Sequence, residues 1–246
     1  MIIICSPTKT IETAHREKGR EILFPEKTKQ ILQWIREMSR GELQKMWKCS
    51  DKVLDKSVKF FDKMDLDKKG AMALDSFTGL FFKNIDAQNL PDQGREYLQN
   101  HLLILSAFYG ILRPFDGIQP YRLDYNDRKS LYQFWKEDLE NEFSKRKGPI
   151  INLASKEYGE DLLSQLTLDH EIIHINFYEE IVNKKGQKEI KQKATPSKEM
   201  RGRFIREMAL QKIDHAESLK KFQINGYSFS EKESQGHRWV FLKEEK

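Results

Sequence analysis

The spacing of apolar residues changes along the chain, and each change predicts an element of secondary structure. The unbroken apolar run at residues 1–5 predicts a short buried strand, ended by a Ser-Pro pair. Apolar residues at helical spacing predict helices that begin at Pro25, at Ser50-Asp51 and at Pro91-Asp92, the last running through Leu105. Shorter patterns predict a helix around Leu43, Met46 and Trp47, a strand over 71–75, an extended segment over 119–124, a helix over 131–143, a strand over 150–153 and a short helix over 156–163.

The last third of the chain has a different pattern, because its predicted strands come in pairs. Residues 171–182 and 188–193 predict a β-hairpin around Lys185-Gly186-Gln187. A basic helix is expected from Pro196 to about Ile213. Two final strands are expected over 225–229 and 237–242. The order of elements predicts a mixed α/β (α+β) fold, with one compact domain over residues 1–246, a central sheet and surrounding helices.

Composition excludes several classes of protein. The 15 Phe, 8 Tyr and 4 Trp among 246 residues are too many core-type side chains for a disordered chain, although 33% of the residues are charged. The longest uncharged apolar stretch, residues 102–112, is shorter than the roughly 18 residues that a membrane span needs. The apolar start has no basic segment before it, so no signal peptide is expected. With only Cys5 and Cys49, the sequence predicts a reduced, cytoplasmic protein.

The net charge of +5 is unevenly distributed. Residues 183–221 contain 12 Lys or Arg and 5 Asp or Glu, a local net charge of +7, whereas the remainder carries a net charge of −2. Such an asymmetry favours a polyanionic partner. The alternative is a solvated helix face with no partner.

Two features with catalytic potential, an H-E-x-x-H match and Cys5, are better explained by structural roles. His170-Glu171-Ile172-Ile173-His174 matches the H-E-x-x-H zinc pattern, which requires a helix. Here the flanking residues predict a strand, in which positions i and i+4 lie roughly 13 Å apart, too far for one zinc ion to bridge. Cys5 ends a predicted strand and has no identifiable His partner, so a core role is favoured over a nucleophile. Neither a metal nor a cofactor is expected.

Polar residues follow two of the predicted strands. Ser6-Pro7-Thr8-Lys9-Thr10 combines hydroxyl groups, free backbone N–H groups and a lysine in a possible anion pocket, although it lacks the glycines of a Walker loop. Asn152, Ser155 and Glu157 come at and after the strand over 150–153, at the edge where open α/β sheets bind ligands. Further aromatic, amide and guanidinium groups lie between these two segments of the sequence, at Gln119, Tyr121, Arg122, Gln133 and Trp135.

Two other segments present backbone or cationic groups. Phe108-Tyr109-Gly110-Ile111-Leu112-Arg113-Pro114 joins two apolar runs through a glycine turn, which helix-hairpin-helix modules use to direct N–H groups at DNA phosphates. The alternative is an ordinary core turn. On the basic helix, Lys198, Arg201 and Arg206 fall near one face, where guanidinium groups suit phosphate or carboxylate recognition.

Taken together, these motifs resemble the YaaA family of bacterial peroxide-stress proteins. The resemblance covers nearly the full length and is most specific over residues 105–123. Its motifs are Ser6-Pro7-Thr8-Lys9-Thr10, Ser50-Asp51-Lys52, Asp75-Ser76-Phe77-Thr78-Gly79-Leu80, the segment from Leu105-Ser106-Ala107 to Gln119-Pro120-Tyr121-Arg122-Leu123, Tyr132-Gln133-Phe134-Trp135, Asn152-Leu153-Ala154-Ser155 with Glu157-Tyr158, Lys198-x-x-Arg201-Gly202 and Phe222…Gly226-Tyr227. This sequence departs from the family pattern at Ala73-Leu74, Ala107 and Cys5.

The resemblance implies a compact mixed α/β domain with a helix-hairpin-helix element, here over residues 107–114, and a positively charged cleft. It also implies DNA binding and protection against iron-dependent damage during peroxide stress. The DNA- or anion-binding residues implied or suggested are Ser6, Lys9, Tyr109, Gly110, Arg113, Tyr121, Arg122, Lys198, Arg201 and Arg206. Polar cleft residues are expected at Gln119, Gln133, Asn152, Ser155 and Glu157.

Three functions stay open at this point. The first is sequence-non-specific binding of double-stranded DNA in oxidative-stress defence. The second is an enzyme acting on a small anionic, nucleotide-like substrate, because a surface that only grips phosphate has little need of Asn, Gln and Glu. The third is a protein whose basic helix binds an acidic protein partner. No membrane association is expected.

Overall fold

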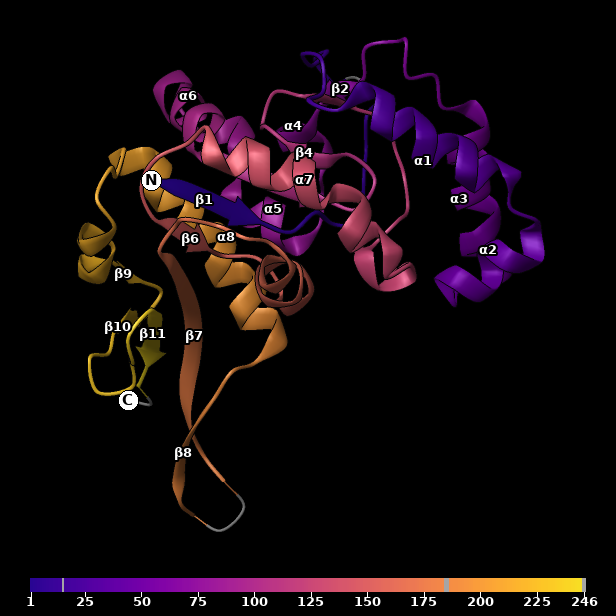
Figure 1. Ribbon diagram of the computed structural model, residues 1–246. Helices are drawn as coiled ribbons and strands as arrows, with labels where there is room; N and C mark the ends of the chain where they lie inside the picture. Colours follow the sequence, from indigo (N-terminus) through magenta and orange to yellow (C-terminus); the bar gives the residue numbers. More distant parts are fainter. Residues whose placement is uncertain (15, 184–185, 245–246) are drawn as a thin grey trace.

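A mostly parallel sheet forms the centre of the molecule in the computed structural model, which describes residues 1–14, 16–183 and 186–244 (Figure 1). The strand order is β4-β3-β1-β6-β7-β11-β10-β9, and β8 pairs with the outer part of β7. The strands are β1 (Ile2–Cys5), β3 (Leu102–Ser106), β4 (Gly110–Leu112), β6 (Ile150–Asn152), β7 (Ile172–Val182), β8 (Lys188–Lys191), β9 (Gln223–Ile224), β10 (Tyr227–Phe229) and β11 (Arg238–Lys243). A second small sheet pairs β2 (Ala71–Met72) with β5 (Gly117–Ile118).

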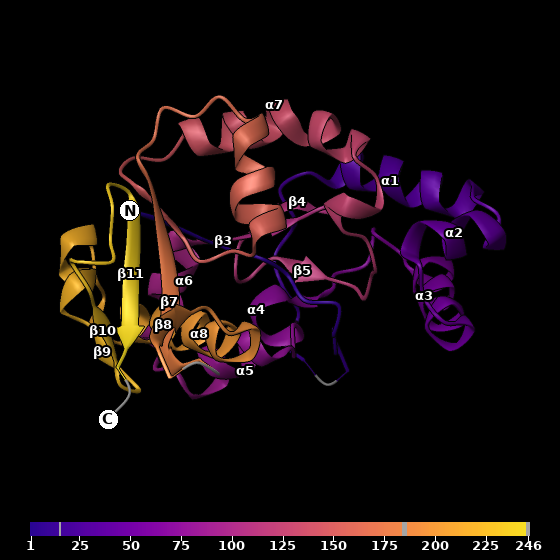
Figure 2. The same ribbon diagram turned by 90° about the horizontal axis from the view of Figure 1, so that it is seen from below.

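Helices cover both faces of the central sheet, with α7 on one side and α5 and α8 on the other (Figure 2). The α-helices are α1 (Pro25–Glu37), α2 (Arg40–Trp47), α3 (Asp51–Lys63), α4 (Ala73–Ser76), α5 (Leu80–Ile85), α6 (Asp92–His101), α7 (Ser130–Ser144) and α8 (Ala194–Gln211). Short helical turns are η1 (Ala87–Asn89), η2 (Tyr125–Asp127), η3 (Glu157–Asp161), η4 (Leu163–Gln165) and η5 (Ala216–Lys221). The predicted mixed α/β fold with a central sheet and surrounding helices is confirmed.

The central strands are β-branched or leucine-rich because both of their faces are covered. β1 is buried along its whole length and pairs in parallel with β3 and β6, so that Ile4 lies beside Leu103 on one side and Asn152 on the other. β6 pairs in parallel with β7. Parallel pairing brings the carboxyl ends of β1, β3 and β6 to one edge of the sheet.

The prediction of a helix-hairpin-helix element over residues 107–114 is wrong. α6 ends at His101, and the apolar residues after it form β3, which turns back antiparallel onto β4 with Leu105 beside Ile111. Residues 102–112 are all buried, so an unbroken apolar run here marks a covered strand rather than a continuing helix. Gly110 has a positive φ of 74° in this β-hairpin, and no backbone N–H group of Tyr109 or Gly110 lies at an exposed helix terminus.

Smaller differences from the predictions concern element boundaries. Of the strand predicted over residues 71–75, only the two residues of β2 are in a strand, because Ala73 begins the short helix α4. α8 begins at Ala194, two residues before Pro196. The predicted pairing of β7 with β8 is confirmed, although Lys185 of the expected turn lies outside the described residues. None of the helices in the described ranges has the length and apolar character needed to cross a bilayer.

Candidate functional site at the carboxyl edge of the sheet

Two serine side chains join the ends of the neighbouring strands β1 and β6. The Ser6 hydroxyl donates to Ser155 Oγ at 3.0 Å, and the backbone N–H of Ser155 donates to Ser6 Oγ at 2.7 Å. The contact forms because β1 and β6 are parallel neighbours, so the residues that follow them meet at the same edge. This is the edge at which open α/β sheets bind ligands.

A lysine, an aspartate and a tyrosine lie beside the serine pair. Lys9 Nζ is 2.6 Å from Asp124 Oδ2, and the Tyr158 hydroxyl donates to Asp124 Oδ1 at 2.8 Å. About half of the Lys9 side chain is exposed, whereas that of Asp124 is 15% exposed. Asp124 thus holds one end of an exposed cation, whose remaining N–H groups face solvent.

Tyr121 reaches the end of β3 from the same loop that supplies Asp124. Its hydroxyl lies 2.9 Å from Ser106 Oγ, and both residues are buried. Burial raises the pKa of the Tyr121 hydroxyl, so this group stays protonated. Tyr121 therefore forms the inner wall of the edge and does not meet solvent.

Two further carboxyl groups have perturbed acidity. Burial, with a smaller contribution from the charge of Asp124, raises the pKa of Glu157, although its carboxylate accepts the Asn126 N–H at 2.7 Å. Burial likewise raises the pKa of Asp127, although the Asp124 N–H donates to it at 2.8 Å and Lys9 and Arg122 oppose the shift. Carboxyl groups whose pKa moves toward neutrality can carry protons at a reaction site.

Four guanidinium groups in the described part of the chain retain a sheltered Nε donor without a partner: Arg122, Arg146, Arg201 and Arg203. The Nε atoms of Arg122 and Arg201 are both inaccessible to solvent and have no hydrogen-bond partner in the described structure. The charge of Arg122 acts on Asp127, whereas Arg201 comes from α8 and feels Glu160 of η3. Burial lowers the pKa of Arg201. An unsatisfied buried donor is costly, so an acceptor supplied by a ligand at either group would be favourable.

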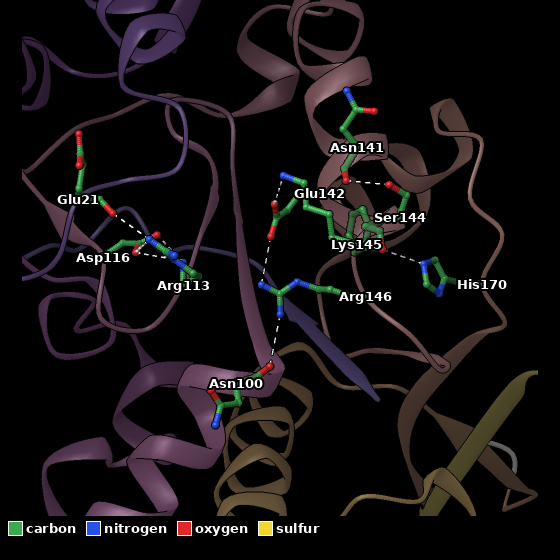
Figure 3. Close-up of polar contacts among 11 residues, drawn as sticks. Glu21, Asn100, Arg113, Asp116, Asn141, Glu142, Ser144, Lys145, Arg146 and His170 are labelled. Carbon is green, nitrogen blue, oxygen red and sulfur yellow. Dashed lines mark hydrogen bonds and ion pairs between the residues drawn. The ribbon is translucent and has the colours of Figure 1, made fainter.

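Several predicted site residues instead serve the fold. Arg113 donates through Nε to Asp116 Oδ1 at 2.8 Å and through Nη2 to the Glu21 carbonyl at 2.9 Å (Figure 3). Tyr109 is buried and exchanges hydrogen bonds with the backbone of Gln119. The Gln119 side chain in turn binds the backbone of Asp65. These side chains hold loops together and lie outside the polar edge.

The three predicted cations of α8 have different surroundings. Arg206 donates to the carbonyl groups of Ile85 and Asp86 at 3.0 and 2.8 Å, so it caps the end of α5. Arg201 is largely buried, and Lys198 is exposed. Lys198 and the likewise exposed Gln133 have no polar partner within the described ranges. Of the three, Lys198 and Arg201 are therefore the ones that do not cap a helix, and phosphate binding by this row stays a prediction.

Replacing Arg206 by methionine should lower the free energy of unfolding by about 1–3 kcal/mol, because the last carbonyl groups of α5 lose charged donors. Urea denaturation would measure the loss. If Arg206 has only this role, the binding of phosphate-bearing ligands to the folded variant stays unchanged. A stability unchanged within error would contradict the capping role.

The two histidines of the H-E-x-x-H sequence are held apart. His174 lies on β7, and its Nδ1 is 2.8 Å from Asn152 Nδ2. His170 precedes the strand and lies beside the end of α7 (Figure 3). Its Nδ1 and Nε2 atoms lie 3.0 and 3.1 Å from the carbonyl oxygens of Gly148 and Phe143. The strand expected from the flanking residues is confirmed. No group of three or more His, Cys, Asp or Glu side chains in the described part of the chain has a geometry that could hold a metal ion.

The sequence patterns missed Asp124 and Asp127, which complete the edge, and gave no individual role to Tyr158. Asp124 precedes the single turn η2, and Asp127 is its last residue. The Asp124 N–H donates to Asp127 Oδ2, and the Asp127 N–H donates to the Asp124 carbonyl. The spacing Asp-x-x-Asp is a capping signal that would have located the turn. The pairing of Asp124 with Lys9 joins loops 115 residues apart, so no local pattern reveals it.

Fold and site together define a mixed α/β protein with a polar site, containing both cations and carboxyl groups, at the carboxyl edge of its sheet. The chain belongs to the peroxide stress protein YaaA family, whose model matches residues 1–233. It is 42% identical over 245 residues to a UPF0246 protein of Finegoldia magna, covering 99% of this chain and 98% of the relative. UPF0246 proteins of Limosilactobacillus reuteri and Agathobacter rectalis are 40% and 35% identical, each with 98% of both chains covered.

Proposed function

We propose that this chain serves the peroxide-stress response by binding a small anionic, nucleotide-like ligand at the carboxyl edge of its sheet. The observation that carries the proposal is the sheltered, unpartnered Nε donor of Arg122, whose charge acts on the Asp127 carboxyl group as the Lys9 charge does. Lys9 and Arg122 suit the phosphate, and the hydroxyl groups of Ser6 and Ser155 suit neutral acceptors. We place this activity in the cytoplasm.

The acidic residues favour a small ligand over a surface that only grips phosphate. Asp124, Asp127 and Glu157 lie among the cations, so the charge of the edge is balanced rather than strongly positive. Glu157 and Asp127, with raised pKa values, are the groups we propose as proton carriers if the ligand is a substrate. Lys9 and Arg122 would bind and orient the substrate.

The proposal is tested by calorimetric titration with adenosine monophosphate at low salt. We expect Lys9→Met and Arg122→Met each to weaken binding by about tenfold or more, because each removes a charge-assisted hydrogen bond that is worth about 1.5–3 kcal/mol. Lys52→Met is the matched control, because Lys52 is an exposed lysine on α3 outside this site. Equal affinities of all three variants and the parent chain, or no binding to the parent, would overturn the proposal.

A second candidate function, non-specific binding of double-stranded DNA that limits iron-dependent damage, is favoured by one observation. The basic excess is concentrated in residues 183–221, and Lys198 within it is exposed. If several phosphates are contacted, affinity for a duplex should fall steeply between about 50 and 200 mM salt. An absent or salt-insensitive complex with a duplex of about 20 base pairs would remove this candidate while leaving the nucleotide site untouched.

A further inference from the structure

One face of β7 is left polar where β7 runs beside β11. The side chains of Ile173, Ile175 and Phe177 are buried, whereas the intervening His174 and Asn176 are only partly buried. These alternate positions share the opposite face of the strand. The structure therefore places polar groups on β7, which is two strands away from β1 in the sheet.

This face borders a hollow of about 470 Å³. Its polar lining comes from η3, η4, β7 and β11, and consists of Glu160, Ser164, His174, Asn176 and Arg238. Arg238 is the register partner of His174 on the neighbouring parallel strand, so both side chains leave the sheet on the same side. A hollow of this volume is large enough for a small-molecule ligand.

Asn152 fixes the tautomer of His174. Asn152 Oδ1 accepts the Ala154 N–H at 2.9 Å, and Asn152 Nδ2 donates to the Gly159 carbonyl at 2.8 Å. Because these two backbone groups determine which end of the amide is which, the second Nδ2 proton points at His174 Nδ1, 2.8 Å away. Nδ1 must then accept, and the proton of the neutral ring resides on Nε2.

The imidazole is also held in its neutral form. Burial lowers the pKa of His174, the charge of His237 acts in the same direction, and Glu160 opposes them. Protonation of Nδ1 would place an N–H group against the Asn152 N–H group, which is unfavourable. His174 is consequently a fixed Nε2–H donor on the part of the ring that faces away from Asn152.

Arg238 supplies a positioned cation along the same face. Its Nη2 donates to the Tyr178 hydroxyl at 2.5 Å, and its guanidinium carbon lies 5.5 Å from the centre of the Tyr178 ring. Arg238 and His174 both line the hollow, so the guanidinium group borders the same space as the imidazole. The remaining guanidinium donors have no protein partner in the described ranges.

We propose that this hollow is a second ligand site, in which His174 Nε2–H and the Arg238 guanidinium group bind a small oxyanion, a phosphate or carboxylate group. The neutral imidazole donates without adding a charge, and the arginine supplies the charge and the forked donors that such groups prefer. Glu160 at the rim disfavours highly charged anions. Asn152 acts as a positioning residue, because it touches His174 and not the ligand.

Nitrogen-15 NMR of the imidazole groups tests the first step. The neutral His174 ring should show its proton on Nε2, and Asn152→Asp should move that proton to Nδ1, because a carboxylate can only accept. A proton found on Nδ1 in the parent protein would overturn the proposal before any ligand is added.

Titration with inorganic phosphate, and separately with acetate, tests the second step. We expect both anions to shift the His174 Nε2–H resonance, with affinities reduced fivefold or more in Arg238→Gln. Arg40→Gln is the matched control, because Arg40 is an exposed arginine on α2 that does not line the hollow. Arg122→Met should leave the shift intact, which separates this site from the one at the carboxyl edge. No shift with either anion, or one equally weakened by Arg122→Met, would overturn the second site.

Discussion

Replacing Arg113 by methionine is expected to lower the free energy of unfolding by about 3–5 kcal/mol, because it leaves a buried carboxylate without its partner. Asp116 is fully buried and accepts the Arg113 backbone N–H and side-chain Nε–H, each at 2.8 Å. Chemical denaturation at pH 7 measures the loss. Arg40→Met is the matched control: Arg40 pairs with Asp51 and Asp55 at the surface, where such pairs contribute about 0–1 kcal/mol.

The same variant has a predictable dependence on pH. Burial raises the pKa of Asp116 in the folded protein despite Arg113, so the fold favours its protonated form. The contribution of this group to stability is therefore complete below its unfolded pKa of about 4, and it is lost as the pH rises through the folded pKa. Without Arg113 the pKa of Asp116 in the folded protein rises further. The variant should therefore lose more unfolding free energy at pH 7 than at pH 4. A loss of unfolding free energy that grew as the pH was lowered would contradict this account.

Gly110→Ala should destabilise the protein by about 2–5 kcal/mol, from a left-handed backbone cost of about 1–2 kcal/mol and overpacking of about 1–3 kcal/mol. Gly110 has a φ of 74°, and a Cβ atom there would lie 2.9 Å from Trp135 and 3.0 Å from Phe24. Trp135 cannot move aside easily, because it is fully buried and its Nε1–H donates to the Ala107 carbonyl at 2.9 Å. Thermal or urea denaturation gives the value.

Gly186 offers a control with the same backbone and no steric conflict. Its φ is 75°, and a Cβ atom would meet no atom of the described residues within 4 Å. Gly186→Ala should therefore cost only the backbone part, about 1–2 kcal/mol. Equal effects at the two glycines would show that the packing of Trp135 against the β3–β4 turn is looser than the structure indicates.

The central strands and most helices could be predicted because their patterns are local. The run at residues 1–5 is continuous and β-branched, and Pro25 marks the first residue of α1. The segment over residues 102–112 was misassigned for a physical reason: an apolar run buried on every side has neither helical nor alternating periodicity. Its conformation is decided by the pairing of β3 with β1 on one side and with β4 on the other.

The site was predictable in part for the same reason. Ser6, Lys9, Asn152, Ser155 and Glu157 follow strands that could be recognised, so their edge followed from the parallel order. Asp124 could not be placed at that edge, because its contacts with Lys9 and Tyr158 join different loops. The sequence does not distinguish Arg122, which has a sheltered donor without a partner, from arginines that bind other parts of the fold. Arg113 and Arg206 are of this second kind.

The hydrogen bonds between Ser6 and Ser155 span 149 residues, which has a consequence for biosynthesis. β1 lies between β3 and β6 in the interior of the sheet, and it finds its second neighbour only when β6 has been made. At about 5–20 residues per second, this delay is on the order of 10 s. During that interval the nascent chain carries an apolar strand with an open edge, which can pair with strands of other chains.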